Sequence, residues 1–275
     1  MYEELYQRIT KPLCSISVYL DQDLISDGSG FAISNDGIVF TAAHVVTGRM
    51  PIHAQDYTDP NVKIFVKFRN MPAVEYCVGI CGINIGTSSF TDNLQIDQAL
   101  IIPKNQLNLP FEPFTIGLAP KLGEEIFFAG YSDELQVPFR IDRLIKPDTV
   151  DLEFGVEVRR GHNSDITGPM IKRGVVGNLL NIETVENSTN QKLQCSVFYI
   201  DNGIHSGASG GPIVNRQGQA IGVIAQRATT SASQSLDAKL AVPSGATVGL
   251  SCLNTIPVMY RQLGAAVQAR LKNRV

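Results

Sequence analysis

The chain has 275 residues, of which 44% are hydrophobic and 18% are charged, so it is long enough to bury a sizeable core in one large or two smaller domains. Its net charge of −3 and pI near 5.8 exclude the strongly basic surface expected of a protein that binds nucleic acid or an anionic membrane. No uninterrupted apolar run approaches the roughly 18 residues of a transmembrane helix.

The amino-terminal segment MYEELYQRITKPLC carries acidic residues early and lacks the basic start and apolar core of a signal peptide. The five cysteines are odd in number, and they show neither a paired spacing nor the spacing of a zinc site. Cys77 and Cys81 lie four residues apart in an expected strand, about 13 Å, which is too far for a disulfide. We therefore expect a cytoplasmic protein with buried free thiols and no metal.

Short segments rich in Val, Ile, Phe and Tyr recur along the chain, separated by Gly, Asn, Asp or Pro, and this pattern predicts an all-β sandwich or barrel. The expected strands are 15–20, 30–34, 37–43, 62–68, 74–83, 98–103, 125–131, 152–160, 195–200, 211–215, 220–226 and 239–244. The segments SNDG and NRQG each end in a glycine that can take a positive φ, so both are expected hairpin turns.

Helical periodicity appears mainly at the two ends of the chain. Near the carboxyl end, Val258, Leu263 and Val267 fall on one stripe, and basic residues come late, where they favour a helix terminus. We expect this helix to pack on the second half of the chain. Pro120 and Gly123 separate two sets of about six strands. The expected domains are a helical brace at 1–11, a first β-barrel at 12–120, a second β-barrel at 121–253 and a helix at 254–275.

The segment HSGASGGPIV surrounds Ser209 with glycine and small residues, as the loop of a nucleophilic serine does. As G-x-S-x-G it matches the nucleophile elbow of an α/β-hydrolase, in which the base histidine follows the serine. All four histidines, at 44, 53, 162 and 205, precede Ser209, and a β-rich segment follows it. The α/β-hydrolase interpretation is therefore excluded.

The same segment also fits a triad in the order histidine, aspartate, serine. His44 follows an expected strand in VFTAAHVVTG, and Asp97 opens the strand LQIDQALIIP. Asp92 lies five residues upstream, but TDN has the character of a turn, whereas D-x-A-L-I fits a strand start. We therefore predict the triad His44, Asp97 and Ser209, with Asp92 as the alternative acid.

These motifs in this order, GSGFAIS-NDGIVFTAAHVV, DQALI and SGASGGPIVNRQGQAIGVIA, resemble the trypsin/chymotrypsin-like serine peptidases. The style is closest to bacterial trypsin-like and HtrA-type protease domains. The resemblance extends over about residues 12–250 and includes IKRGVVGNL and AVPSG, which are similar to strands flanking the substrate cleft. It implies two six-stranded antiparallel β-barrels, here followed by a C-terminal helix.

The resemblance also implies roles for further residues. The N–H groups of Gly207 and Ser209 would form the oxyanion hole, and Ala208 stands where the family commonly has Asp or Asn. Gly203, six residues before the nucleophile, would lie at the base of the primary specificity pocket. That pocket would be lined by Ala225, Gln226 and Arg227 together with His205.

With no carboxylate at Gly203, we expect a small or medium apolar residue on the acyl side of the cleaved bond. His205 and Arg227 would alternatively favour an acidic or polar group. The sequence lacks an IVGG-type start, so activation by insertion of a freed amino terminus is not expected.

The expected function is a serine endopeptidase that cleaves polypeptides through an acyl-enzyme and needs no cofactor. The alternatives are a non-catalytic or regulated scaffold of the same fold and an esterase. Because uncontrolled proteolysis in a cytosol is hazardous, we expect a regulatory partner or an occluded cleft, and no nucleic acid or membrane partner.

Overall fold

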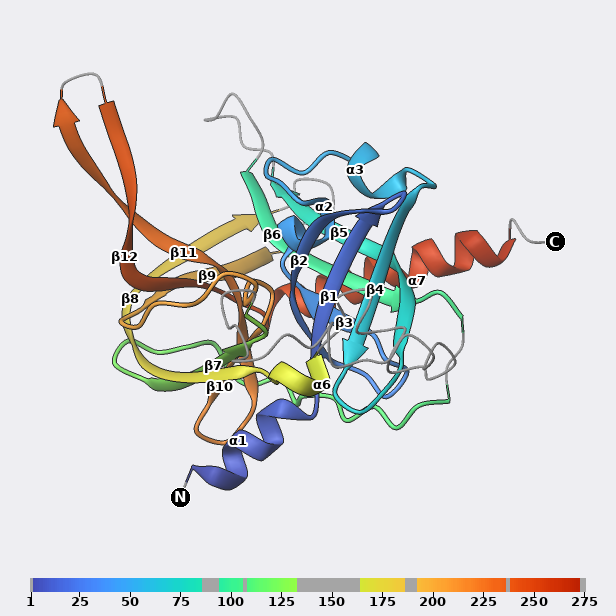
Figure 1. Ribbon diagram of the computed structural model, residues 1–275, viewed down its shortest axis with the longest axis horizontal. Helices are drawn as coiled ribbons and strands as arrows, with labels where there is room; N and C mark the ends of the chain where they lie inside the picture. Colours follow the sequence, from blue (N-terminus) through green and yellow to red (C-terminus); the bar gives the residue numbers. More distant parts are fainter. Residues whose placement is uncertain are drawn as a thin grey trace, which may run out of the picture.

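The computed structural model describes residues 2–85, 94–105, 108–132, 164–185, 192–235 and 238–272. Their strands form two closed antiparallel β-barrels of six strands each, which lie side by side in Figure 1. The predicted chymotrypsin-like, all-β architecture is therefore confirmed. In the described part of the chain, no helix combines the length and apolar character needed to cross a bilayer.

The first barrel has the strand order β1-β2-β3-β6-β5-β4. Its strands are β1 (Leu13–Leu20), β2 (Asp23–Ala32), β3 (Val39–Thr41), β4 (Val62–Phe68), β5 (Ala73–Ile85) and β6 (Leu94–Pro103). Two short helices, α2 (Ala43–Thr47) and α3 (Gln55–Thr58), follow β3. The turn between β2 and β3 contains the expected positive-φ glycine, Gly37, at +78°.

The second barrel has the strand order β10-β11-β12-β9-β8-β7. Its strands are β7 (Glu125–Gly130), β8 (Met170–Val185), β9 (Lys192–Ile200), β10 (Pro212–Asn215), β11 (Ala220–Ser235) and β12 (Ala238–Ser251). The short helix α6 (Ser164–Thr167) precedes β8. The hairpin of β11 and β12 projects away from the barrel (Figure 1).

One strand of the second barrel differs from the sequence prediction. The expected strand 152–160 lies outside the described residues, and β8 completes the barrel between β7 and β9. The apolar pattern does not predict β8, because glycines and polar residues interrupt its apolar positions, although the family resemblance includes the segment IKRGVVGNL within it. The connection 104–124 joins the two barrels, and the domain boundary that we propose at 120 falls within it.

The two barrels share one hydrophobic core. Phe31, Phe40 and Leu100 of the first barrel pack in the same cluster as Phe127 and Val223 of the second. One further cluster fills the interior of the first barrel, and another fills the interior of the second. Burial of this kind contributes about 25 cal/mol for each Å² of apolar surface removed from water, so the contact between barrels is itself a source of stability.

The terminal helices brace this shared core. In α1 (Glu3–Thr10), Leu5 and Ile9 are buried, and Arg8 donates a hydrogen bond to the carbonyl of Gln217 at 3.0 Å. In α7 (Thr255–Lys272), the buried Leu263 lies against Gly79 of β5. The expectation that the tail packs on the second barrel is therefore incomplete, because α7 also contacts the first.

All five cysteines are free, as predicted. Cys14, Cys195 and Cys252 are buried, whereas Cys77 and Cys81 are partly exposed. Burial raises the pKa of the Cys81 thiol to about 12 and that of the Cys195 thiol to about 11. Such thiols hold little thiolate near neutral pH, which fits packing roles.

Candidate active site

The register of β3 and β6 brings His44 to Asp97. Thr41, the last residue of β3, pairs with Ala99 of β6 in an antiparallel ladder. The residues that follow Thr41 therefore run beside those that precede Ala99. His44 comes three residues after the ladder ends, in α2, and Asp97 lies two residues before Ala99.

Two hydrogen bonds join His44 and Asp97. The ring Nδ1 of His44 lies 2.7 Å from Oδ2 of Asp97, and the backbone N–H of His44 donates to Oδ1 at 2.9 Å. The side chains are 26% and 15% exposed, so the pair is screened from water while the ring still reaches the surface. A carboxylate held at both oxygens fixes the ring orientation and leaves Nε2 for a reacting proton.

Ser209 lies in the loop before β10, and this loop is held against the first barrel. The carbonyl of Ser209 accepts a hydrogen bond from the N–H of Ser29 in β2 at 2.8 Å. A Cβ on Gly28, the neighbour of Ser29, would lie 3.1 Å from that carbonyl oxygen and 2.7 Å from the side chain of Val45, the residue after His44. The backbone of Ser209 is therefore placed next to the turn that carries His44.

The glycines around Ser209 have separate structural causes. Gly207 and Gly210 have φ of +81° and +82°, in the left-handed region that disfavours other residues. A Cβ on Gly210 would also overlap the carbonyl oxygen of Ser29 and the hydroxyl of Thr41, and one on Gly211 would overlap the carbonyl of Ala129. Close packing against both barrels, as well as access to the serine, therefore requires glycine here.

The N–H groups of Gly207 and Ser209 are the two expected in the oxyanion hole. Among the described residues, the structure gives no hydrogen-bond acceptor for the N–H of Gly207 or that of Ser209. The intervening Ala208 is 3% exposed and packs in the interior of the second barrel. Its side chain is thus directed away from the surface of the loop.

The residues assigned to the specificity pocket come from two segments, 203–205 and 225–227, and Gly245 lies beside the first. A Cβ on Gly203 would lie 3.2 Å from backbone atoms of Gly245, so the backbones at 203 and 245 face each other. Arg227 of β11 donates from Nε to the carbonyl of Ile204 at 2.9 Å. Ala225 is buried, whereas Gln226 is exposed. His205 and Ile204 line a space of only about 10 Å³, room for about one water.

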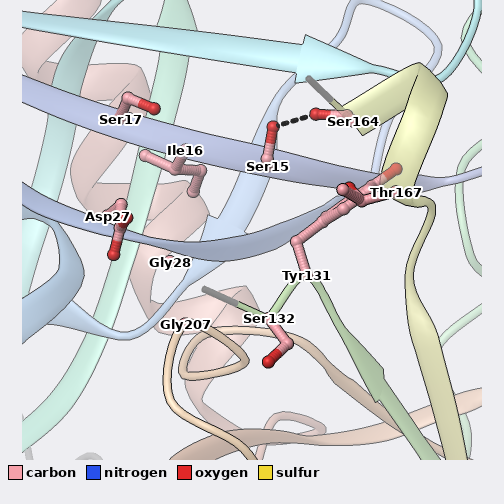
Figure 2. Close-up of a pocket in the computed structure, with 10 residues that line it drawn as sticks. All are labelled: Ser15, Ile16, Ser17, Asp27, Gly28, Tyr131, Ser132, Ser164, Thr167 and Gly207. Atoms are coloured by element: carbon pink, nitrogen blue, oxygen red, sulfur yellow. Dashed lines mark hydrogen bonds between the residues drawn. The ribbon is translucent and has the colours of Figure 1, made fainter. Parts of the chain in front are cut away.

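A second cavity, of about 90 Å³, adjoins the Ser209 loop. Figure 2 shows Gly28 and Gly207 at its edge, with Tyr131 at the end of β7 and Ser164 and Thr167 of α6 opposite. Most of its lining side chains carry hydroxyl groups. The cavity is therefore polar, and it meets the loop at Gly207.

Three residues near the site were not predicted from the sequence. Lys172 of β8 donates from Nζ to the carbonyl of Gly203 at 2.5 Å, and Ser29 bonds to the Ser209 loop. Gln98 is fully buried, and its Nε2 donates to the carbonyl of Ser251 in β12, which ties β6 to the second barrel. Each lies within a segment that resembles the family, GSGFAIS, IKRGVVGNL or DQALI, but the segments do not indicate these contacts, because the partners are distant in sequence. The alternative acid, Asp92, lies outside the described residues.

Two barrels with a histidine–aspartate pair in the first and a glycine-framed serine in the second define a chymotrypsin-like peptidase architecture. Residues 28–223 match the family described as the trypsin-like peptidase domain. This match spans well over half of the chain, from Gly28 to Val223. The protein belongs to the trypsin-like peptidase family and is a serine peptidase by that membership.

Solved structures with a similar fold include those of the Rv3671c protease from M. tuberculosis. Its active form has a TM-score of 0.54 and 16% identity, covering 94% of this chain and 84% of that one. An inactive serine-to-alanine mutant form has a TM-score of 0.53 and 17% identity, covering 95% and 90%. At this identity the likeness supports the fold alone. No curated protein sequence matches the chain.

Proposed function

We propose that the chain is a serine endopeptidase in which Ser209 is the nucleophile, His44 the general base and Asp97 the residue that orients His44. The observation that carries the proposal is the pair of hydrogen bonds by which the ring Nδ1 and the backbone N–H of His44 bind the two carboxylate oxygens of Asp97. The Ser209 loop is anchored beside the same turn. A peptidase family and a preorganised histidine together favour catalysis over a scaffold role.

The proposed reaction has two halves. Ser209 Oγ bonds to the substrate carbonyl carbon while its proton passes to Nε2 of His44, and the resulting oxyanion is bound by the N–H groups of Gly207 and Ser209. The carbon–nitrogen bond then breaks, and the amine leaves with the proton from His44. Water hydrolyses the ester in the same way, with His44 again accepting and returning the proton.

A fluorophosphonate probe tests this proposal, because it phosphonylates only an activated serine and releases fluoride. We expect a single adduct by intact mass on the wild-type protein and none on Ser209→Ala or His44→Ala. Asp97→Asn should lower kcat by about 10⁴-fold, since the wrong histidine tautomer is then favoured. Asp92→Asn is the matched control and should leave kcat unchanged. Absence of labelling on folded wild-type protein would favour the scaffold.

For specificity, we propose that the pocket does not accept Lys or Arg and takes a small or medium apolar side chain. The base of the expected pocket, at Gly203, carries no carboxylate. The cationic groups of Lys172 and Arg227 donate hydrogen bonds to the carbonyls of Gly203 and Ile204. Those two cations also favour the second candidate, an acidic side chain. A peptide-library cleavage profile separates the two, and a preference for Lys or Arg would contradict both.

We also propose that activity is restrained by a protein partner or by closure of the cleft, and that the enzyme works in the cytosol. The free cysteines support a reducing compartment. Incubation of the purified chain with casein tests the restraint. Slow or partner-dependent cleavage is expected, and rapid unrestricted digestion would contradict it.

A further inference from the structure

Ser29 of β2 makes four hydrogen bonds at the junction of the two barrels, although it is completely buried. Its hydroxyl donates to the carbonyl of Gly207 at 2.9 Å and accepts the N–H of Tyr131 at 2.8 Å. Its backbone N–H donates to the carbonyl of Ser209 at 2.8 Å, and its own carbonyl accepts from the Thr41 hydroxyl at 2.7 Å.

Two of these bonds hold peptide groups of the Ser209 loop, the nucleophile loop of the proposed enzyme. Ser29 binds the carbonyls of Gly207 and Ser209, while the N–H groups of the same two residues are those proposed to bind the oxyanion. A carbonyl and the N–H that follows it lie in one rigid plane, so Ser29 fixes the Gly207–Ala208 and Ser209–Gly210 peptides. The Ala208–Ser209 peptide, which carries the N–H of Ser209, lies between these two planes, and the Gly207 N–H lies directly before the first of them.

We propose that Ser29 is a positioning residue for the oxyanion hole, an inference that rests on the proposed function. Its backbone N–H holds the Ser209 end of the loop, as any residue except proline would. Its hydroxyl holds the Gly207 end, and only a side chain that both donates and accepts can bridge the Gly207 carbonyl and the Tyr131 N–H.

Glycine at 207 makes this bridge important. Gly207 lies at a φ of +81° and has no side chain to limit its rotation, so its peptide groups turn easily unless they are bound. Removal of the hydroxyl would take the partner from the part-buried Gly207 carbonyl and from the buried Tyr131 N–H, and rotation of the Gly207 peptide is the direct way to rehydrate the carbonyl. The adjoining polar cavity supplies the space (Figure 2).

The neighbours of the Ser29 hydroxyl are closely packed, which leaves little room for a larger side chain at position 29. A Cβ on Gly130 would lie 2.9 Å from the Ser29 hydroxyl and would overlap Ala208, so β7 already packs closely here. The Ser29 hydroxyl thus joins β2, the residue that follows β7 and the nucleophile loop in a closely packed place. The three meet although Ser29 and Gly207 are 178 residues apart in the chain.

The test compares Ser29→Ala with Ser251→Ala. Ser251 is a suitable control because it is equally buried and its hydroxyl also accepts a backbone N–H, that of Ser196, away from the nucleophile loop. Both variants lose a buried hydroxyl, so both should lose some stability in urea unfolding. For Ser29→Ala we expect kcat for a peptide ester and the fluorophosphonate labelling rate to fall by about 10- to 100-fold, with KM nearly unchanged.

A low-field NMR signal from the proton between His44 and Asp97 serves as the second readout. We expect it to persist in Ser29→Ala, since the histidine–aspartate pair does not depend on Ser29. A labelling rate equal to that of wild type, an equal loss in Ser251→Ala, a loss through KM alone or disappearance of the NMR signal would each overturn the role of Ser29. If the wild-type protein is not labelled at all, the proposed function fails and this inference fails with it.

Discussion

Gly210, the residue after the proposed nucleophile, offers a test of why the loop is rich in glycine. Gly210 and Gly123 have nearly equal φ, +82° and +79°. A Cβ on Gly123 would meet nothing within 4 Å, whereas one on Gly210 would overlap backbone and side-chain atoms of Ser29 and Thr41. Alanine at the two positions therefore carries the same backbone cost, but only Gly210→Ala adds a steric cost.

The left-handed conformation costs about 1–2 kcal/mol for alanine, which is the expected loss for Gly123→Ala. Overpacking adds about 1–3 kcal/mol, so Gly210→Ala should lose about 2–5 kcal/mol of unfolding free energy. Urea unfolding followed by far-UV circular dichroism measures both variants, since the chain has no tryptophan. Gly210→Ala should also slow fluorophosphonate labelling, because the clash moves Ser209. Equal losses for the two variants would refute the packing argument.

Three further predictions concern stability away from the nucleophile. Lys67 is 2% exposed and its ammonium binds Asp165 at 2.8 Å, so Lys67→Met should cost about 3 kcal/mol, and a double-mutant cycle with Asp165→Asn should show coupling. Burial raises the pKa of the Cys252 thiol from about 9 to about 12. The folded state therefore keeps a proton that the unfolded state loses. Unfolding free energy should fall by roughly 1 kcal/mol between pH 8.5 and 10 through this thiol, and Cys252→Ala should lack that part of the slope. Leu263→Ala should cost about 2–4 kcal/mol, and Leu122→Ala, at a 66% exposed position, under about 0.5 kcal/mol, both by urea titration; similar losses would exclude α7 as a brace.

Much of the architecture is encoded in local sequence patterns. Alternating apolar segments predict strands because a strand with one buried face repeats every two residues. The turn glycines at 37 and 218 both have positive φ, as their positions after polar residues predict. The order His44, Asp97, Ser209 and the local motifs around these residues were sufficient to indicate a peptidase. Sequence patterns predict strands at the positions of β3 and β6. The register in which these two strands pair then brings His44 to Asp97.

The tertiary structure decided the features that depend on contacts between distant segments. Ser29 and Gly207 lie 178 residues apart, and Gln98 and Ser251 lie 153 apart. No periodicity or motif links such pairs, because their proximity results from the packing of one barrel on the other. The strict need for glycine at 210 has the same origin: the sequence predicts a loop open to substrate, but the steric limit comes from β2 and β3 of the other barrel.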